Sequence, residues 1–412
     1  MKIKYRFSDF CVEEELHSGI LSDEGIFHVW RIEKRGIDTL DLINQISKIF
    51  NIRRERITTC GLKDKYSVSL LHLAVDTLEL NSNLPKKISG RGFSGYFVGK
   101  SKEPLKPKFI KGNRFKIVLR DIHLDEVKDY ENNIKDVARY GLPNYFDEQR
   151  FGSVRHLRHL QSKTRDGIYD FIARRIILGD YESALKIHFM ALSPEDRSKV
   201  RKFKKKMRKL WGKWRECLLY AQNKNDIQIL KHLKKNKDFL TAISLIDRRL
   251  LRLYLETYQS YVWNSVLSNI IKDTFSKVYY FPYYVGNFVF PLEYTDDAVR
   301  RVRDIKIPLP HRDVEIPDFL RKYFSEVTLK EGISLKEFLI PKEMKVDFTK
   351  MERKAWINFP EVSWKVEDDE YFEQRKKITI EFGMPPGSFA TILVKKITPL
   401  IPKSITEKKP FL

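Results

Sequence analysis

A single carboxylate lies between two lysines in the run Gly61-Leu62-Lys63-Asp64-Lys65. Two neighbouring ammonium groups favour the ionised form of Asp64 and lower its pKa. An ionised carboxylate can act as a nucleophile, and flanking cations allow it to approach the sugar or base of a polyanion. Gly61 predicts a tight backbone bend where a bulky group comes close. The alternative is a surface turn with solvated charges, since exposed ion pairs are common and weak.

A second group of polar and aromatic side chains occupies residues 144–152, which read Asn-Tyr-Phe-Asp-Glu-Gln-Arg-Phe-Gly. Amides and arginine bind base edges and phosphates, while aromatic rings stack on unpaired bases. The composition therefore predicts RNA contact here, with Arg150 among the binding residues. A core loop with Tyr145 and Phe151 buried is the alternative.

A third segment is strongly basic. Between Arg197 and Arg215, eleven of nineteen residues are Lys or Arg and none is acidic. Large apolar side chains recur within it at helical spacing, at Phe203, Met207, Leu210, Trp211 and Trp214. We predict one basic amphipathic helix whose lysines contact phosphates, among them Lys204, Lys205 and Lys206. A solvated charged face and a membrane-surface helix are the alternatives, the second disfavoured because only one segment has this character.

The whole chain is basic as well. Its 412 residues contain 78 Lys and Arg against 55 Asp and Glu, a formal net charge of +23. This excess indicates a polyanionic partner. No apolar run approaches the roughly 20 residues of a membrane helix, and no signal peptide is recognisable at the N-terminus, so we expect no membrane partner. Cys11, Cys60 and Cys217 lie far apart, which disfavours disulfides and indicates the cytoplasm.

Patterns for cofactor binding are weak. Residues 90–95 match GxGxxG but do not clearly open a helix after a strand. His156 and His159 stand three apart, without the cysteines or carboxylates that would complete a metal site. We therefore predict no metal and no organic cofactor.

The elements that must position these residues are of mixed type. Strands are predicted at residues 10–14 and 66–75, the second of them apolar, and by period-two alternation at 26–32, 112–120 and 377–382. Residues 39–50 have the apolar spacing of a helix. Residues 155–275 are largely helical in pattern, and residues 278–318 are typical of irregular strands and loops. Because βαβ units do not repeat, we predict an α+β fold with an antiparallel or mixed sheet. Its catalytic domain comprises residues 1–152 and 350–412, and a largely helical α+β domain, 153–349, is inserted.

Five motifs in this order resemble the TruD family of tRNA pseudouridine synthases and extend over nearly the whole chain. The family patterns are D-F-x-V-x-E, G-x-K-D-[KR], N-Y-F-x-x-Q-R-F-G, a helix ending in [QR]-S-[YAW]-[LV]-[FW]-N, and P-x-G-[SC]-[FY]-A-T. They match residues 9–14, 61–65, 144–152, 252–264 and 385–391.

The resemblance implies a role for individual residues. Asp64 would be the nucleophile that breaks the glycosidic bond of uridine, with no cofactor, and Lys4 its basic partner. Phe10 and Phe389 would enclose the uracil. Asn144 would contact the uracil, and Phe146 would pack or stack beside it.

The resulting interpretation is a tRNA pseudouridine synthase that acts on uridine 13 of the D arm, with RNA contacts at Lys63 and Lys65 as well. No coiled-coil repeat argues for assembly, so a monomer is expected. A non-catalytic RNA-binding protein of the same fold is the first alternative. The second is a phosphate-ester hydrolase, which would require a divalent metal and clustered carboxylates to hold it.

Overall fold

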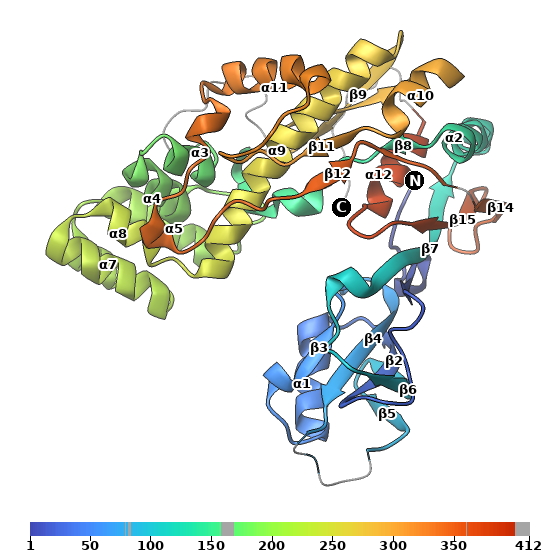
Figure 1. Cartoon of the computed structure of the whole chain (residues 1–412), viewed down its shortest axis with the longest axis horizontal. Helices are drawn as coiled ribbons and strands as arrows, with labels where there is room; N and C mark the ends of the chain where they lie inside the picture. Colours follow the sequence, from blue (N-terminus) through green and yellow to red (C-terminus); the bar gives the residue numbers. More distant parts are fainter. Residues whose placement is uncertain (79, 81–83, 158–168, 360, 400–412) are drawn as a thin grey trace. The chain divides into compact units, whose positions relative to one another are not determined.

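The structure is a computed structural model that describes residues 1–78, 80, 84–157, 169–359 and 361–399. The chain forms two compact units, Met1–Gly141 with Asn358–Leu412, and Leu142–Ile357 (Figure 1). The units change at 141/142 and 357/358, whereas the sequence analysis places the domain boundaries at 152/153 and 349/350. The reason for the difference is that strand β8 (Leu142–Pro143) pairs with β13 (Trp356–Ile357), which joins the two ends of the second unit.

Unit 1 (Met1–Gly141 with Asn358–Leu412) is built around a sheet. Among the described residues it has nine strands in the order β14-β15-β7-β1-β4-β2-β6-β5, with β3 paired to β4. The strands are β1 (Phe10–Leu16), β2 (Phe27–Arg35), β3 (Ile57–Thr59), β4 (Val68–Asp76), β5 (Lys87–Gly90), β6 (Phe93–Ser101), β7 (Ile110–Ile122), β14 (Val362–Asp368) and β15 (Lys376–Met384). Neighbouring strands are antiparallel except β1 and β4, which are parallel. The predicted mixed α+β architecture is therefore confirmed.

The helices of unit 1 are α1 (Thr39–Ile49), α2 (Val127–Tyr140) and α12 (Ala390–Ile397), with 3₁₀ segments η1 (Phe7–Asp9), η2 (Arg54–Arg56), η3 (Pro107–Phe109) and η4 (Leu124–Glu126). Helix α1 begins where the Asp38 side chain accepts a hydrogen bond of 2.8 Å from the Asp41 amide, a cap that satisfies a free backbone donor. Its Leu42 and Ile46, one turn apart, pack with Trp30 and Ile32 of β2 in one buried cluster. Burial of such side chains stabilises by about 1.5–3 kcal/mol each, which fixes α1 against the sheet.

Unit 2 (Leu142–Ile357) is organised around the long helix α9 (Arg248–Thr274), whose inner face is buried from Leu251 to Ile271. The other elements are η5 (Glu148–Leu157), α3 (Ile172–Ile177), α4 (Tyr181–Met190), α5 (Ser198–Leu210), α6 (Trp214–Leu218), α7 (Lys224–Asn236), α8 (Phe239–Ser244), β9 (Val278–Tyr283), β10 (Gly286–Pro291), α10 (Asp296–Arg303), β11 (Lys306–Pro308), α11 (Asp318–Glu331), η6 (Leu335–Glu337), η7 (Lys342–Met344) and β12 (Glu352–Lys354). Helices α4 to α8 contact one another in sequence and form a helical lobe, residues 181–244, at one end of the unit (Figure 1).

Two predictions about elements are wrong in unit 2. The basic segment is not one helix, because α5 ends at Leu210 and α6 begins at Trp214. Gly212 lies between them with φ of 87°, a left-handed conformation that suits glycine and ends a helix. Residues 278–318 contain the regular helix α10, which is capped by Thr295, as well as strands and loops.

Candidate active site

Asp64 lies in unit 1 on the loop that joins β3 to β4. Its carboxylate accepts hydrogen bonds from Lys4 Nζ and, at 3.0 Å, from the Tyr66 amide. Burial raises the pKa of Asp64, but the hydrogen bond and charge of Lys4 outweigh this and hold the pKa below its ordinary value. The side chain is 33% exposed. Asp64 is therefore an ionised and accessible carboxylate, as a nucleophile must be.

Lys4 reaches Asp64 from a segment that Arg120 holds at both ends. The backbone of Lys2 exchanges two hydrogen bonds with that of Arg120, at 2.7 and 2.9 Å. The carboxylate of Asp9 accepts two more, both at 2.9 Å, from the Arg120 guanidinium, which is almost fully buried. A paired guanidinium and carboxylate of this geometry is rigid. Arg120 thus fixes residues 2–9, which carry Lys4.

Lys34 supports the backbone of Asp64. It is fully buried on β2, and its ammonium donates to the carbonyl oxygens of Asp64 at 2.6 Å and Ile37 at 2.9 Å. Ser67 Oγ donates to the same Asp64 oxygen at 2.7 Å. Burial lowers the pKa of Lys34 to about 8. These bonds hold the backbone of the nucleophile and not its carboxylate.

Lys63, which the sequence analysis assigns to RNA, is directed into the protein. Its ammonium lies 3.1 Å from Glu14 Oε2 and donates to Asn113 Oδ1 at 2.7 Å. Glu14 is fully buried, and although burial raises its pKa, His72 and Lys63 lower it overall. The structure therefore shows Lys63 anchoring the loop, while Lys65 is exposed.

The predicted bend at Gly61 is wrong. Gly61 does not have a positive φ, and a Cβ atom there would meet nothing within 4 Å. The loop is shaped by side-chain hydrogen bonds instead. Thr39, the first residue of α1, accepts from the Lys63 amide at 2.9 Å and donates to the Lys63 carbonyl at 3.3 Å.

Two aromatic groups lie beside the Lys4–Asp64 pair, one against Lys4 and one that includes Tyr66, whose amide bonds Asp64. Phe10 is buried, with its ring centroid 4.4 Å from Lys4 Nζ. Phe7 and Tyr66 are exposed and stack on each other with centroids 6.2 Å apart. Phe389 is half-buried in the same unit, at the N-cap of α12.

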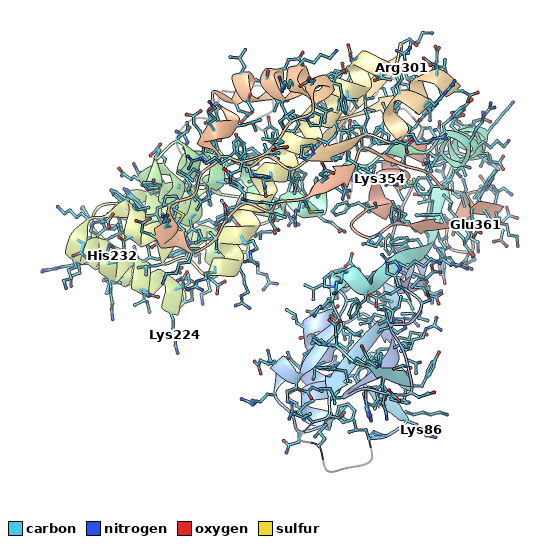
Figure 2. The ribbon with its side chains drawn as sticks, viewed as in Figure 1. Lys86, Lys224, His232, Arg301, Lys354 and Glu361 are labelled. Atoms are coloured by element: carbon cyan, nitrogen blue, oxygen red, sulfur yellow. The ribbon has the colours of Figure 1, made fainter. Side chains whose placement is uncertain are left out.

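Asn144 and Phe146 lie in unit 2, where Arg353 holds them. Arg353 is buried; it donates to Asn144 O at 2.9 Å and to Asn144 Oδ1 at 2.5 Å, and its guanidinium lies 4.3 Å from the Phe146 ring centroid. Asn144 Nδ2 also donates to Lys354 O at 2.9 Å. Figure 2 labels Lys354 on β12. Both side chains of the motif are therefore packed into the framework of unit 2.

The remaining predicted RNA contacts differ in their surroundings. Arg150 forms an ion pair with Glu256 at 3.0 Å, and Lys204 forms one with Asp196 at 2.9 Å. Lys205 and Lys206 are exposed on α5. Among the predicted contacts, Lys65, Lys205 and Lys206 are exposed and form no ion pair with any residue in the described part of the chain.

Sequence reasoning missed Lys34, Glu14, Arg120 and Arg353. Glu14 and Lys34 could have been recognised from the sequence. On β1, Glu14 shares the buried face with Phe10 and Val12, and on β2, Lys34 shares it with Trp30 and Ile32. A charged residue at an inward position of an alternating strand indicates a paired group. Arg120 and Arg353 carry no such signal, because Arg120 follows three consecutive buried residues and Arg353 lies on a strand of three residues, so neither stands in a clear alternation.

Within the described part of the chain, no three His, Cys, Asp or Glu side chains gather as a metal site would require. His159 lies outside the described residues. None of the described helices has the combined length and apolarity of a membrane span.

Comparison with known proteins identifies the family and the fold. The sequence profile of the family tRNA pseudouridine synthase D (TruD) matches residues 1–397. A Methanococcus maripaludis protein named "Probable tRNA pseudouridine synthase D 1" is 30% identical over 96% of this chain and 99% of its own length. An Aquifex aeolicus "tRNA pseudouridine synthase D" is 27% identical over 96% and 98%. The crystal structure of a Methanosarcina mazei protein described as a TruD enzyme has the same fold, with a TM-score of 0.71 at 22% identity, covering 96% of this chain and 93% of the other.

Proposed function

Because the chain belongs to the TruD family of tRNA pseudouridine synthases, we propose that it converts a uridine of tRNA to pseudouridine with Asp64 as nucleophile. The target that the family favours is uridine 13 in the D arm. The observation that carries the proposal is the pairing of an accessible, ionised Asp64 with Lys4. The cytoplasmic location and the monomeric state stay predictions.

The isomerisation of uridine needs only a nucleophilic carboxylate and a cation that keeps it charged. In the overall isomerisation the N1–C1′ bond breaks and a C5–C1′ bond forms, while C5 loses a proton and N1 gains one, so the composition of the nucleotide does not change. Asp64 would form a transient bond to the sugar or to the base ring, which a carboxylate with a low pKa can both make and release. Lys4 keeps the carboxylate charged until the substrate arrives.

The surroundings support an RNA substrate. The target uridine must leave its stack to reach Asp64, which costs a few kcal/mol and is offset by stacking on aromatic side chains. Phe7 and Tyr66 are exposed beside the nucleophile and fit that role. We also propose that Phe10, Phe389, Asn144 and Phe146 contact the substrate, as the family implies, and that Lys65, Lys205 and Lys206 contact phosphates.

The test uses an unmodified tRNA transcript with wild-type protein and with Asp64→Asn. Pseudouridine is mapped by carbodiimide labelling and primer extension, and transcript binding is measured in parallel. We expect a D-arm stop with wild type, none with Asp64→Asn, and binding within a few fold for both, since affinity comes mainly from phosphate contacts.

Asp23→Asn is the matched control, because Asp23 is an exposed carboxylate of the same unit. It should behave as wild type. Product formed by Asp64→Asn at the wild-type rate would refute the nucleophile, and tight binding without product by wild type would favour the non-catalytic alternative.

A further inference from the structure

Unit 2 contains a cavity of about 390 Å³ that the proposed reaction does not use. It lies among η5, α4, α5 and α9, and its apolar walls come from Ile172, Ile187, Ala191, Leu250 and Leu253. Cavities that bind small planar molecules have this size and combine apolar walls with a few polar groups. The walls could cover the two faces of a flat ring.

Two histidines and a tyrosine provide polar edges. His156 Nε2 lies 3.1 Å from the Asp170 carbonyl oxygen, and His188 Nδ1 lies 2.9 Å from Tyr254 Oη. Neither His156 Nδ1 nor His188 Nε2 has a hydrogen-bond partner among the residues that the structure describes. Burial lowers the pKa of both histidines to about 4, so both are neutral at pH 7. Neutral imidazoles donate or accept single hydrogen bonds and do not attract charge.

The charged groups of the cavity balance one another. Arg155 and Lys204 are matched by Glu195 and Asp196, and Lys204 is bonded to both oxygens of Asp196, at 3.0 and 2.9 Å. A phosphate would meet two carboxylates here, which disfavours it. The cavity thus offers donors and acceptors without net charge, which suits a neutral heterocycle.

The position of the cavity links it to RNA. Lys204 belongs to α5, whose Lys202, Lys205 and Lys209 are exposed. Residues 197–237 of the helical lobe contain sixteen Lys or Arg against Glu216 and Asp226 only. In Figure 2 the side chain of Lys224, on α7, projects outward from this lobe. Because Lys204 lines the cavity and the exposed lysines lie on the same helix, a nucleic-acid backbone on α5 would pass within about one helix diameter, roughly 10 Å, of the cavity.

We propose that this cavity binds a second unstacked base of the tRNA, distinct from the target uridine, while adjacent phosphates lie on α5. The inference rests on the proposed function in that it takes RNA as the substrate. Walls of the cavity stack on the base, and the histidine edges and Arg155 bind its polar atoms.

The experiment compares full-length wild type with Leu253→Trp. Leu253 lines the cavity and is 38% exposed, so an indole at this position fills the cavity without replacing a buried core residue. Leu329→Trp is the matched control, because Leu329 is 84% exposed on α11 in the same unit and does not line the cavity. Binding of an unmodified tRNA transcript is measured at several salt concentrations. Base reactivity toward dimethyl sulfate and carbodiimide is mapped on each complex.

We expect Leu253→Trp to bind the transcript about tenfold more weakly, as expected for loss of one base–protein stack. The salt slope of binding should not change, because no phosphate contact is lost. One base outside the target site should be protected by wild type and Leu329→Trp but reactive with Leu253→Trp. His188→Leu, which keeps the volume and removes the polar edge, should give the same loss of protection.

Wild-type affinity and an unchanged reactivity pattern in both variants, with thermal melting showing folded protein, would overturn the proposal. So would an affinity loss in which no base changes its reactivity. Neither the binding measurement nor the base mapping requires turnover. If wild type formed no pseudouridine, the proposed function would be refuted, but the test of the cavity could still be interpreted.

Discussion

Four side chains from separate strands and segments determine the chemical state of Asp64. Lys4 hydrogen-bonds its carboxylate, Lys34 and Ser67 hold its carbonyl oxygen, and Thr39 fixes the preceding residue. Lys4 thereby stabilises the negative charge of Asp64, while the other three side chains fix the backbone of the loop. Preorganisation of this kind lowers the cost of reaching a reactive geometry.

Lys4→Met should move the acid limb of kcat/KM to higher pH. Lys4 is the main group that lowers the pKa of Asp64, so without it the carboxylate protonates at a higher pH and the acid limb of kcat/KM moves with it. The measurement is kcat/KM against pH for both proteins, and we expect the loss of activity to be largest on the acid side of the profile.

Lys2→Met is the control, since Lys2 is exposed and its bonds to Arg120 are made by the backbone. Its pH profile should match that of wild type. An acid limb that does not move in Lys4→Met would show that Lys4 does not control the ionisation of Asp64.

Lys34→Met should destabilise the protein by about 1–3 kcal/mol, because buried carbonyl oxygens lose a donor. The difference in stability between wild type and Lys34→Met depends on pH, and the direction of this dependence follows from the pKa of Lys34. The pKa of Lys34 falls from 10.5 to about 8 on folding, so between these values the unfolded chain binds more protons. The stability of wild type relative to Lys34→Met therefore rises as pH increases through that window.

Chemical denaturation at both ends of the window measures this effect. Lys48→Met, at an exposed position on α1, should show no such dependence. A stability difference between wild type and Lys34→Met that is constant with pH would contradict a lowered pKa for Lys34.

At the scale of elements, two arrangements matter for function. The parallel pairing of β1 with β4 aligns Cys11 with Val68, so the end of the nucleophile loop meets the strand that carries Phe10 and Glu14. In unit 2, the break at Gly212 ends α5 and lets α6 turn back, where Cys217 Sγ donates to Leu210 O at 3.2 Å. The exposed lysines of α5 are thus confined to a straight helix of three to four turns.

Neutralising Lys202, Lys205 and Lys209 together should reduce the steepness of the salt dependence of tRNA binding. Each lost phosphate contact lowers the log–log slope by about 0.7–0.9, so three contacts correspond to a change of about 2 to 3. The measurement is transcript affinity over a range of salt concentrations.

The control variant loses the same charge at Lys330, Lys336 and Lys345, which are exposed elsewhere in unit 2. Its slope should stay close to that of wild type. Equal changes in both variants would show that only net charge matters, and no change in the α5 variant would show that α5 does not contact RNA.

At the scale of the whole molecule, charge is distributed unevenly. A short part of the helical lobe holds most of the excess of basic residues, whereas Asp64 lies in the sheet of the other unit. Long-range attraction and the chemical step are therefore carried by different parts of the chain. Electrostatic attraction raises association rates and is weakened by salt.

For this reason kcat/KM should fall by at least about tenfold between about 50 and about 200 mM salt, while kcat at saturating tRNA changes little. The Lys4–Asp64 pair is short and half-buried, and salt screens such pairs weakly. Steady-state kinetics at several salt concentrations provide the check. A kcat that falls in parallel with kcat/KM would show that salt acts on the active site itself.

The sequence by itself determined the candidate nucleophile, the mixed fold and the basic surface. Asp64 is recognisable because its immediate neighbours are charged, strands β2, β7 and β15 because their side chains alternate, β4 because it is an apolar run, and α1 because its apolar residues repeat every three to four positions. Each of these signals is local. It depends on the types of residues that stand close together in the chain.

Only the tertiary structure decided how the nucleophile is held. Lys34 meets Asp64 across 30 positions and Lys4 meets it across 60, while Arg120 reaches Asp9 across 111. The predicted bend at Gly61 and the single basic helix were wrong because long-range hydrogen bonds and a left-handed glycine override local pattern. Such contacts form only when strands pack side by side, and strand order is set by the burial of the whole sheet, which no short stretch of sequence contains.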